Sequence, residues 1–329
     1  MPNPRVILTV DTEPSIAGAL KDPARYSPLL EQPVWGEVNG RSEALGFITE
    51  TLCRFDLAAT FFVETVHTGY FGEMAMAPYV RHLVDKHQDV QLHIHPVWLN
   101  LLRDSPFGDR TFNDDSAALP EHELSELLKQ GIEQIQRWTG QRPVALRTGN
   151  FDASSSVYRA MRQAGLELSS NLCGSGRTYA EAVLNRSGGI CQVEGITELP
   201  VTCFSDQGPV GKGRLRAAQI TACSAAELIN LLEQCASQQV DTVVLVTHPF
   251  EFIKKSSFRY DDLRPNRLVQ SRLIKLCQFL SHNRDRFEVC TFADIARQDR
   301  CSESPPPQLD GSALHSIYRA LQNVINDHL

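Results

Sequence analysis

Short apolar runs alternate with longer amphipathic segments along most of the chain. The apolar runs have the length of strands and lie at Val6–Val10, Ala59–Val63, Val90–His93, Val144–Leu146, Val240–Val246 and Phe287–Thr291. The amphipathic segments place large apolar residues at helical spacing and lie at Glu121–Trp138, Ser224–Ser237 and Pro265–Leu280. Strands that alternate with helices predict parallel strands with crossover helices, and therefore an α/β barrel or a doubly wound sheet.

Two stretches interrupt this alternation. Residues 96–120 have the composition of a long loop above the sheet, and residues 174–215 predict an excursion with short strands around Ile190–Val193 and Thr197–Cys203. Insertions beside a regular scaffold often shape a substrate pocket, so we expect these two to carry specificity.

The end of the chain predicts a linker and a last helix. Residues 299–310 contain the proline-rich stretch Cys301–Gln308, and residues 311–329 carry an apolar stripe at helical spacing, formed by Leu314, Ile317, Leu321 and Val324. We expect this stripe to pack back on the body of the protein, and docking of a partner is the alternative. The main domain is then residues 1–298.

Composition excludes several classes of protein. There are 32 basic and 39 acidic residues, and the net charge of −7 argues against a nucleic-acid partner. Nine scattered cysteines without a CxxC pair predict no zinc ribbon and suit a reducing compartment. No apolar stretch approaches the ~20 residues of a transmembrane helix. The run Val6–Val10 is too short for a signal-peptide core, so we expect a cytoplasmic protein. The oligomeric state is not predicted.

Polar side chains follow four of the apolar runs. Asp11 and Glu13 follow the first run, His93 and His95 end the third, Arg147 follows the fourth, and His248 follows the long run that ends at Val246. Side chains two residues apart in an extended chain point the same way. Because the carboxyl ends of parallel barrel strands gather on one face, we expect these six residues to meet there.

Each of these residues alone has an ordinary structural explanation. A histidine at a strand end is commonly a rim residue, and Asp-x-Glu after a strand is commonly a turn or a helix cap. None of these explanations predicts that the residues meet on one face of the barrel. Two histidines and a carboxylate form a facial ligand set for a divalent metal, with positions left for water and substrate. A second carboxylate can take a proton from that water, and a third histidine can protonate a leaving group.

These segments resemble the motifs of the polysaccharide deacetylase family, which is the NodB-homology domain of carbohydrate esterase family 4. The matching strings occur in the family's order from about residue 5 to residue 294. They are LTVDTEP at 8–14, ATFFV at 59–63, DVQLHIHP at 89–96, LRTGNF at 146–151 and LVTHP at 245–249.

The resemblance implies a distorted (β/α)₇ barrel, here with loop insertions and a C-terminal helix, and the removal of an acetyl group from an N-acetylated sugar. It implies a divalent metal, for which zinc is expected and cobalt, nickel, manganese or iron are alternatives. Asp11 would be the general base, Arg147 would hold Asp11 ionised, and His248 would protonate the departing amine. Glu13, His93 and His95 would bind the metal.

Three departures from the family pattern qualify this assignment. The second histidine of the family motif lies four residues after the first, where this chain has Val97, so either His95 supplies the third ligand or the metal site is altered. The usual adjacent aspartates are replaced by Asp11 and Glu13. No carboxylate stands where the family supports its last histidine, and Asp152 or Glu251 would have to substitute.

The expected substrate is an N-acetylated sugar or a sugar-linked precursor of a surface polysaccharide inside the cell. The candidate substrate-binding residues are Trp98, Asn150, Phe151 and Glu251, and Phe107 is a further aromatic residue able to stack on a sugar. Two alternatives remain open. One is hydrolysis of another C–N bond, such as a cyclic amide; a glycosidase is disfavoured because Asp11 and Glu13 lie too close together in sequence to flank a glycosidic bond. The other is a carbohydrate-binding barrel without catalysis.

Overall fold

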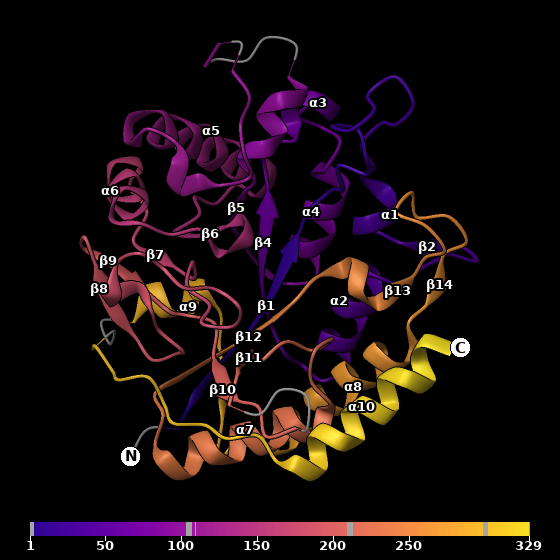
Figure 1. The fold of residues 1–329 in the computed structure, drawn as a ribbon, viewed down its shortest axis with the longest axis vertical. Helices are drawn as coiled ribbons and strands as arrows, with labels where there is room; N and C mark the ends of the chain where they lie inside the picture. The colour runs from indigo at the N-terminus through magenta and orange to yellow at the C-terminus, as the bar shows by residue number, and fades with distance from the viewer. Residues whose placement is uncertain (1–2, 103–106, 109, 209–212, 299–301, 329) are drawn as a thin grey trace.

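The computed structural model of the chain describes residues 3–102, 107–108, 110–208, 213–298 and 302–328. Its centre is a curled sheet, visible in Figure 1 around the strands β1 and β4. Seven of the described strands run parallel, in the spatial order β12 (Thr242–Thr247), β1 (Arg5–Thr12), β4 (Thr60–Glu64), β5 (Asp89–Ile94), β6 (Ala145–Thr148), β7 (Leu168–Ser169) and β9 (Ile196–Glu198).

Smaller strands extend this sheet and decorate it. β8 (Cys191–Val193) runs antiparallel to β9, and β15 (Glu288–Val289) pairs with the start of β1. Three hairpins lie outside the sheet: β2 (Glu37–Val38) with β3 (Arg41–Ser42), β10 (Cys203–Ser205) with β11 (Leu215–Ala217), and β13 (Ile253–Lys254) with β14 (Arg264–Pro265).

Backbone hydrogen bonds connect the two ends of the strand order. The amide of Thr202, shortly after β9, donates to the carbonyl of Val244 in β12 at 3.0 Å. The amide of Ile220 donates to Val246, and Val246 donates to Ala218, both at 3.1 Å. The sheet is therefore curled into a distorted, incomplete barrel, and the predicted α/β fold of this type is confirmed.

Helices on the outside connect successive strands of the barrel (Figure 1). They are α2 (Leu45–Arg54), α4 (Ala77–Asp85), α5 (Glu121–Thr139), α6 (Ser155–Ala164), α7 (Ala225–Gln238) and α8 (Arg267–His282). The chain marks their ends locally: a capping box between Ser224 and Glu227 begins α7, and Gly140, with a φ of 74°, ends α5. The three helices expected from periodicity are α5, α7 and α8, within a few residues.

Shorter helices fill the connections. They are α1 (Glu31–Val34), α3 (Thr68–Phe71) and α9 (Phe292–Arg297), together with the 3₁₀ turns η1 (Pro96–Leu101), η2 (Ser116–Ala118), η3 (Gly149–Phe151), η4 (Ala182–Leu184) and η5 (Pro249–Phe252). The long loop expected at 96–120 contains η1 and η2, and its residues 103–106 and 109 lie outside the described part of the chain. The excursion at 174–215 contains β8, β9 and β10, so the expected second strand is split in two.

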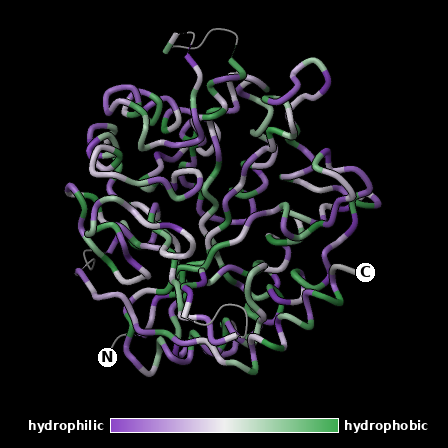
Figure 2. The backbone as a smooth tube through the Cα atoms, viewed as in Figure 1, coloured by the Kyte–Doolittle hydropathy of each residue, from purple (hydrophilic) through white to green (hydrophobic). Residues whose placement is uncertain are grey.

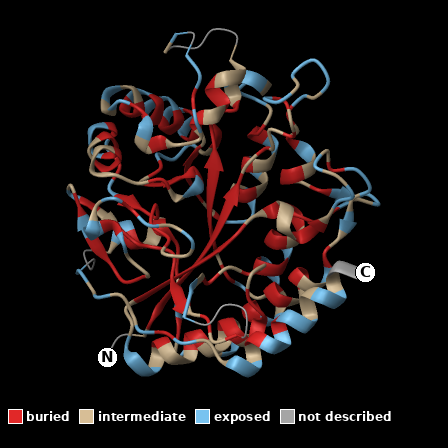
Figure 3. Ribbon diagram, viewed as in Figure 1, coloured by how far each residue is buried: buried red, intermediate tan, exposed pale blue. Residues whose placement is uncertain are grey.

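The apolar core lies between the sheet and the helices. Every residue of β1, β4 and β12 is buried, as expected for parallel strands covered on both faces, and Figure 3 shows these strands in red. The strands are thereby fixed, so the residues at their carboxyl ends are held on a rigid frame.

The end of the chain differs from the sequence expectation. The residues expected to form a linker run along the barrel, where Ser304 pairs with Ile190 and the carbonyl oxygen of the buried Leu309 accepts a hydrogen bond from the amide of Ser205. The last helix, α10 (Ala313–His328), is present. The expectation that its apolar stripe packs on the body was wrong, because Leu314, Leu321 and Val324 are 57–77% exposed.

None of the described helices has both the length and the apolar character needed to cross a membrane.

Candidate functional site

The polar residues expected at the strand ends lie at one end of the barrel. Strand register brings them together, because Val10 of β1 pairs with Thr247 of β12, and His93 of β5 pairs with both Glu64 of β4 and Arg147 of β6. These pairings place the carboxyl ends of β1, β5, β6 and β12 side by side. The sequence argument from strand ends therefore located this cluster.

Asp11 and Arg147 form a buried ion pair. The guanidinium Nη1 of Arg147 donates to Asp11 Oδ1 at 2.7 Å, and the two side chains are 0% and 4% exposed. Arg147 also donates to the hydroxyls of Thr9 and Ser170 and to the carbonyl of Ser170. The ring of Phe62 lies 4.5 Å from the guanidinium carbon. A charge held from three sides in this way can orient Asp11 with little freedom.

Glu13, His93 and His95 form a cluster of potential metal ligands. Glu13 Oε2 lies 3.3 Å from His93 Nε2 and 2.5 Å from His95 Nε2, and the three ligand atoms all lie within 4.8 Å of one another. Burial works to raise the pKa of Glu13, but the two imidazoles outweigh it and hold that pKa well below its usual range. Burial works against the charge on His95, but Glu13 and Asp114 raise its pKa well above the usual value.

The other ring nitrogen of each histidine is held by a hydrogen-bond acceptor. His93 Nδ1 lies 2.7 Å from the carbonyl oxygen of Arg147, and His95 Nδ1 lies 2.8 Å from Asp114 Oδ2. These acceptors hold the Nδ1 side of each ring, so both Nε2 atoms face Glu13 and would be the atoms that bind a cation. A carboxylate behind a histidine is a common support for a metal ligand. The sequence offered no signal for Asp114, which lies in the long loop.

Gly149 allows His95 to take this position. A Cβ atom on Gly149 would lie 2.3 Å from His95 Nδ1, so any side chain there would displace the imidazole. The next residue, Asn150, has a φ of 54° and donates from its side-chain amide to Asp114 Oδ2 at 2.8 Å. The segment after β6 therefore packs against His95 and also orients the carboxylate behind it.

His248 faces Asp11 from the other side of the cluster. Its Nε2 lies 3.8 Å from Asp11 Oδ2, and its Nδ1 lies 2.9 Å from Glu251 Oε1. Burial disfavours the charged imidazole, but Glu251 outweighs it and raises the pKa of His248 to about 9. Glu251 also accepts hydrogen bonds from Thr247 and Gln219.

Of the two carboxylates considered as the support of His248, Glu251 makes the contact. Asp152 instead forms an ion pair with Arg177 and accepts a hydrogen bond from the amide of Ser116. The expectation that Glu251 binds substrate is not supported by its position, because His248, Thr247 and Gln219 already occupy both of its oxygens.

Two of the other expected substrate contacts are placed differently. Trp98 is 1% exposed and packs beside His67 and Phe71, so its ring has no free face for a sugar. Phe151 is half-buried, and its ring lies 5.6 Å from the guanidinium carbon of Arg147. The sequence did not reveal that both rings are packing partners, because an aromatic residue in a loop has the same appearance in either role.

Glu64 is a further polar residue at the strand ends that sequence reasoning missed. It ends β4 and is fully buried, and its carboxylate accepts hydrogen bonds from the amides of Val66, His67 and His95. It also lies 2.6 Å from His67 Nδ1. Glu64 thus ties the connection after β4 to the backbone of His95, which is a positioning contact.

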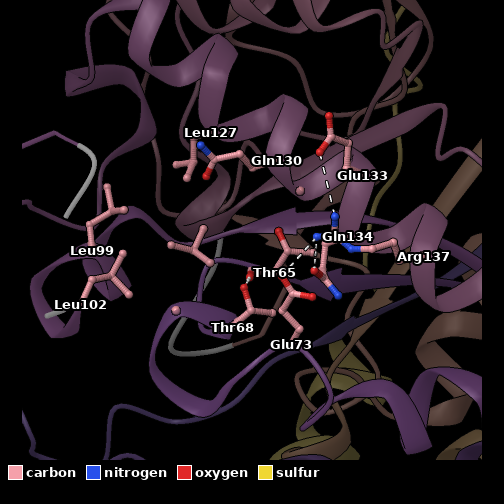
Figure 4. A pocket seen from close by; sticks show the side chains of 13 residues that line it. Thr65, Thr68, Glu73, Leu99, Leu102, Leu127, Gln130, Glu133, Gln134 and Arg137 are labelled. Atoms are coloured by element: carbon pink, nitrogen blue, oxygen red, sulfur yellow. Dashed lines mark hydrogen bonds and ion pairs between the residues drawn. The ribbon is translucent and has the colours of Figure 1, made fainter. Parts of the chain in front are cut away.

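A separate cavity of about 300 Å³ lies beside this end of the barrel, between the segment after β4, η1 and α5 (Figure 4). Its walls include Thr65, Leu102, Gln134 and Arg137. The residues of the Asp11 and Glu13 clusters do not line it, so we do not assign it to the same site.

Comparisons with known proteins agree with this fold. No protein-family model matches the sequence, and a search of curated proteins gave no significant match. Among solved structures, the chain is similar to a candidate polysaccharide deacetylase from Mycobacterium smegmatis, at 17% identity and a TM-score of 0.53, covering 90% of this chain and 89% of the other. A family 4 carbohydrate esterase from Streptomyces lividans also matches, at 12% identity and a TM-score of 0.44, covering 93% and 99%. So does a peptidoglycan deacetylase from Bacillus subtilis, at 11% identity and a TM-score of 0.43, covering 90% and 91%.

At such identities the similarity concerns the fold. The M. smegmatis protein matches over 90% of this chain and 89% of its own. The chain therefore has the polysaccharide-deacetylase fold that its motifs resemble.

Proposed function

We propose that the protein is a metal-dependent hydrolase that removes the acetyl group from an N-acetylated sugar. The observation that carries this proposal is the arrangement of three groups at one barrel end: a buried Asp11–Arg147 pair, a Glu13–His93–His95 cluster and a His248–Glu251 pair. They supply a proton acceptor, a metal-binding set and a proton donor within one cluster.

The residues present fit a divalent cation. One carboxylate oxygen and two imidazole Nε2 atoms converge, and the Nδ1 atoms of both histidines are occupied by acceptors. Three protein ligands of this type, with further positions open, are typical of catalytic zinc sites, and cobalt, nickel, manganese or iron are compatible with the same donors. A bound cation supplies a Lewis acid that polarises the amide carbonyl and makes water easier to deprotonate.

Asp11 is the proposed general base. Arg147 fixes its carboxylate through Oδ1, and the second oxygen, Oδ2, lies 3.8 Å from His248 Nε2. A carboxylate held in this position can accept the proton that water loses as it attacks the amide carbon. The buried guanidinium is therefore a positioning group for the base.

His248 is the proposed general acid. With a pKa of about 9 its imidazole is protonated at neutral pH, and Glu251 holds Nδ1 so that Nε2 faces the site. The leaving amine must gain a proton when the C–N bond breaks, and Nε2–H is positioned to donate it. Asp11 and His248 thus have opposite proton tasks in the proposed reaction.

The identity of the sugar is a further part of the proposal. An N-acetylated precursor of a surface polysaccharide remains the expected substrate, and Asn150, whose side chain is exposed beside Asp114, remains a candidate substrate contact. The same machinery would also hydrolyse another C–N bond, such as a cyclic amide. A sugar-binding barrel without catalysis is the remaining alternative, in which a sugar binds without metal.

Product analysis separates these functions. The zinc-loaded protein is incubated with N-acetylglucosamine, its nucleotide-linked form, its oligomers and a cyclic amide, and products are measured by proton nuclear magnetic resonance. We expect free acetate and a free amine from at least one acetylated sugar. A ring-opened acid from the cyclic amide alone, or binding of sugar with no product, contradicts the proposal. Asp241→Asn is the matched control for Asp11→Asn, the variant that removes the proposed base. Asp241 pairs with Arg5 at the start of β1, at the other end of the barrel.

A further inference from the structure

Helix α10 packs on the body through its polar face. Arg319 and Ser316 are buried, and the guanidinium of Arg319 contacts Glu227 of α7 at 2.5 Å and Asp206 at 3.0 Å. The hydroxyl of Ser316 donates to Asp206 at 3.0 Å. Detachment of the helix would take Arg319 away from both buried carboxylates and would leave Asp206 with Arg216 and Glu227 with Ser224, so the Arg319 contacts hold α10 in place.

Near the end of the helix, Asn323 continues this polar contact. Its side-chain oxygen accepts a hydrogen bond of 2.8 Å from Arg272 of α8. The backbone carbonyl of Asn326 accepts another from Lys254. The polar face is thus attached along its length, which fixes the orientation of the opposite face.

The apolar face of α10 points away from the body. Its six large side chains are 46–77% exposed: Leu314, Ile317, Tyr318, Leu321, Val324 and Ile325. Figure 2 shows hydrophobic residues along this helix, and Figure 3 shows exposed ones on its outer side. Together they expose roughly 600 Å² of side-chain surface, which reaches the upper range for the largest apolar patch on a monomer. We call these six residues the α10 stripe.

The spacing of the α10 stripe suits another helix. Leu314, Ile317, Leu321 and Val324 follow one another at intervals of three, four and three residues, which is the a/d pattern of a coiled-coil seam. Such a seam buries itself against a second helix with a matching seam. Each side of a standard protein interface buries about 800 Å², so the stripe supplies most of an interface.

Charge favours a second copy of this chain over a membrane. Among the described side chains of α10, Arg319 alone belongs to Lys, Arg, Asp or Glu, and it is buried against the body. Helices that lie on lipid surfaces carry lysine and arginine on the helix itself, beside its apolar face. The basic residues near this stripe, Lys254, Arg264 and Arg267, belong instead to the body and line a cavity at the end of α10. The chain has a net charge of −7, so two copies repel each other generally but meet without repulsion at this uncharged stripe.

We propose that the α10 stripe is the interface of a homodimer in which two α10 helices pack antiparallel about a two-fold axis near Leu321. In a two-fold interface residue i contacts residue j and j contacts i. With Leu321 on the axis, Ile317 lies opposite Ile325 of the second copy, and Tyr318 lies opposite Val324. The face is therefore self-complementary.

A cavity beside the stripe extends this interface. It has a volume of about 370 Å³ and lies between the end of α10, the start of α8 and β14. Its walls combine the apolar Pro265, Leu268 and Ile325 with the basic Lys254, Arg264 and Arg267. Ile325 lines this cavity. In the proposed dimer, Ile317 of the second copy lies opposite Ile325 and therefore faces the opening of the cavity. This dimer is independent of the catalytic proposal, since none of the site residues lies on α10.

Sedimentation equilibrium with the full chain over a range of concentrations tests the proposal. We expect wild-type protein at twice the chain mass of 36.7 kDa. Leu321→Glu should be monomeric, because two glutamates would meet at the axis. It should still unfold in one cooperative transition, because the monomer exposes this position, and its unfolding temperature should no longer depend on protein concentration. The matched control is Val183→Glu on η4, where an equally exposed valine (54%) becomes charged away from α10.

Charge pairing tests the axis itself. A mixture of Leu321→Glu and Leu321→Lys proteins should form heterodimers, because opposite charges then meet at Leu321. A wild-type protein that stays monomeric at about 100 µM, where a dimer of micromolar Kd would be almost fully formed, would overturn the proposal. A dimer that persists in Leu321→Glu would do the same, as would a wild-type monomer that sediments with phosphatidylglycerol vesicles. Failure of the mixture to pair would overturn the antiparallel arrangement.

Discussion

Arg147 and Asp11 form an ion pair 2.7 Å long that neither side chain shares with solvent. Removing one partner of such a pair leaves the other charge buried without compensation. Arg147→Met should therefore lower the free energy of unfolding by about 3–5 kcal/mol, the range for breaking a buried pair. Urea denaturation measures it. Asp11→Asn keeps an oxygen acceptor for the guanidinium and should cost less. If Arg147→Met unfolds like wild type, the guanidinium is not the support that holds Asp11.

A side chain at position 149 should disturb the metal cluster. The Cβ of Gly149→Ala would lie 2.3 Å from His95 Nδ1, so the imidazole must move away from Asp114 and Glu13. We expect weaker zinc binding, measured by competition with a chromogenic chelator. Gly40→Ala is the control, because its Cβ meets nothing within 4 Å. Gly40 has a positive φ and Gly149 does not, so backbone strain from the added methyl group falls on the control alone. Equal zinc affinity in the two variants would contradict this role of Gly149.

The carboxylate behind His95 should tune metal affinity without binding the metal. Asp114→Asn weakens the acceptor at His95 Nδ1, and loss of such a support typically costs about 10–100-fold in affinity or activity. Asp115→Asn is a close control, because the neighbouring Asp115 caps η2 and accepts from the amide of Ala117. A titration with zinc compares them. An Asp114→Asn protein with wild-type affinity would mean that His95 needs no such support.

The pH dependence of the reaction should report His248. Its pKa of about 9 lies above the usual value near 6.5, so the acid form is present at neutral pH and is lost as pH rises through about 9. The rate should fall on this alkaline limb. Glu251 raises that pKa, so Glu251→Gln should move the limb to lower pH, which initial rates from pH 6 to pH 10 would reveal. The contact between His248 and Glu251 also stabilises the folded state. This stabilisation is complete below about pH 6.5 and is lost as pH rises through about 9.

If the rate of Glu251→Gln falls over the same alkaline pH range as that of wild type, a group other than His248 controls this fall. His82 is a suitable control residue, because burial lowers rather than raises its pKa and it lies outside the site, beside Thr49 and Trp35. His82→Gln should leave the alkaline limb unchanged.

The sequence predicted the core of the site because strand geometry repeats every two residues. Asp11 lies in β1, and His93 lies in β5. His95 follows the last residue of β5 with extended backbone angles, φ −126° and ψ 103°, so the alternation continues for one more step and both imidazoles share a side. Parallel pairing then brought the strand ends together, which a local pattern is able to predict.

Contacts between distant segments were not predictable in this way. Asp114 lies in a loop 19 residues after His95, and Gly149 reaches the same imidazole from the turn after β6. The stripe on α10 predicted a helix but not its orientation, because the buried Asp206 and Glu227 under the helix draw the polar face inward. Periodicity identifies an apolar face and does not say what covers it.

Acetate release under controlled metal content tests the central claim most directly. Protein stripped by exhaustive chelation is assayed with the acetylated sugar that gave product, before and after addition of one equivalent of zinc, beside Asp11→Asn treated identically. We predict no acetate from the stripped enzyme, recovery on zinc addition, and no recovery in Asp11→Asn although it binds zinc. Undiminished acetate release after chelation, or from zinc-loaded Asp11→Asn, would contradict metal-dependent hydrolysis with Asp11 as its base.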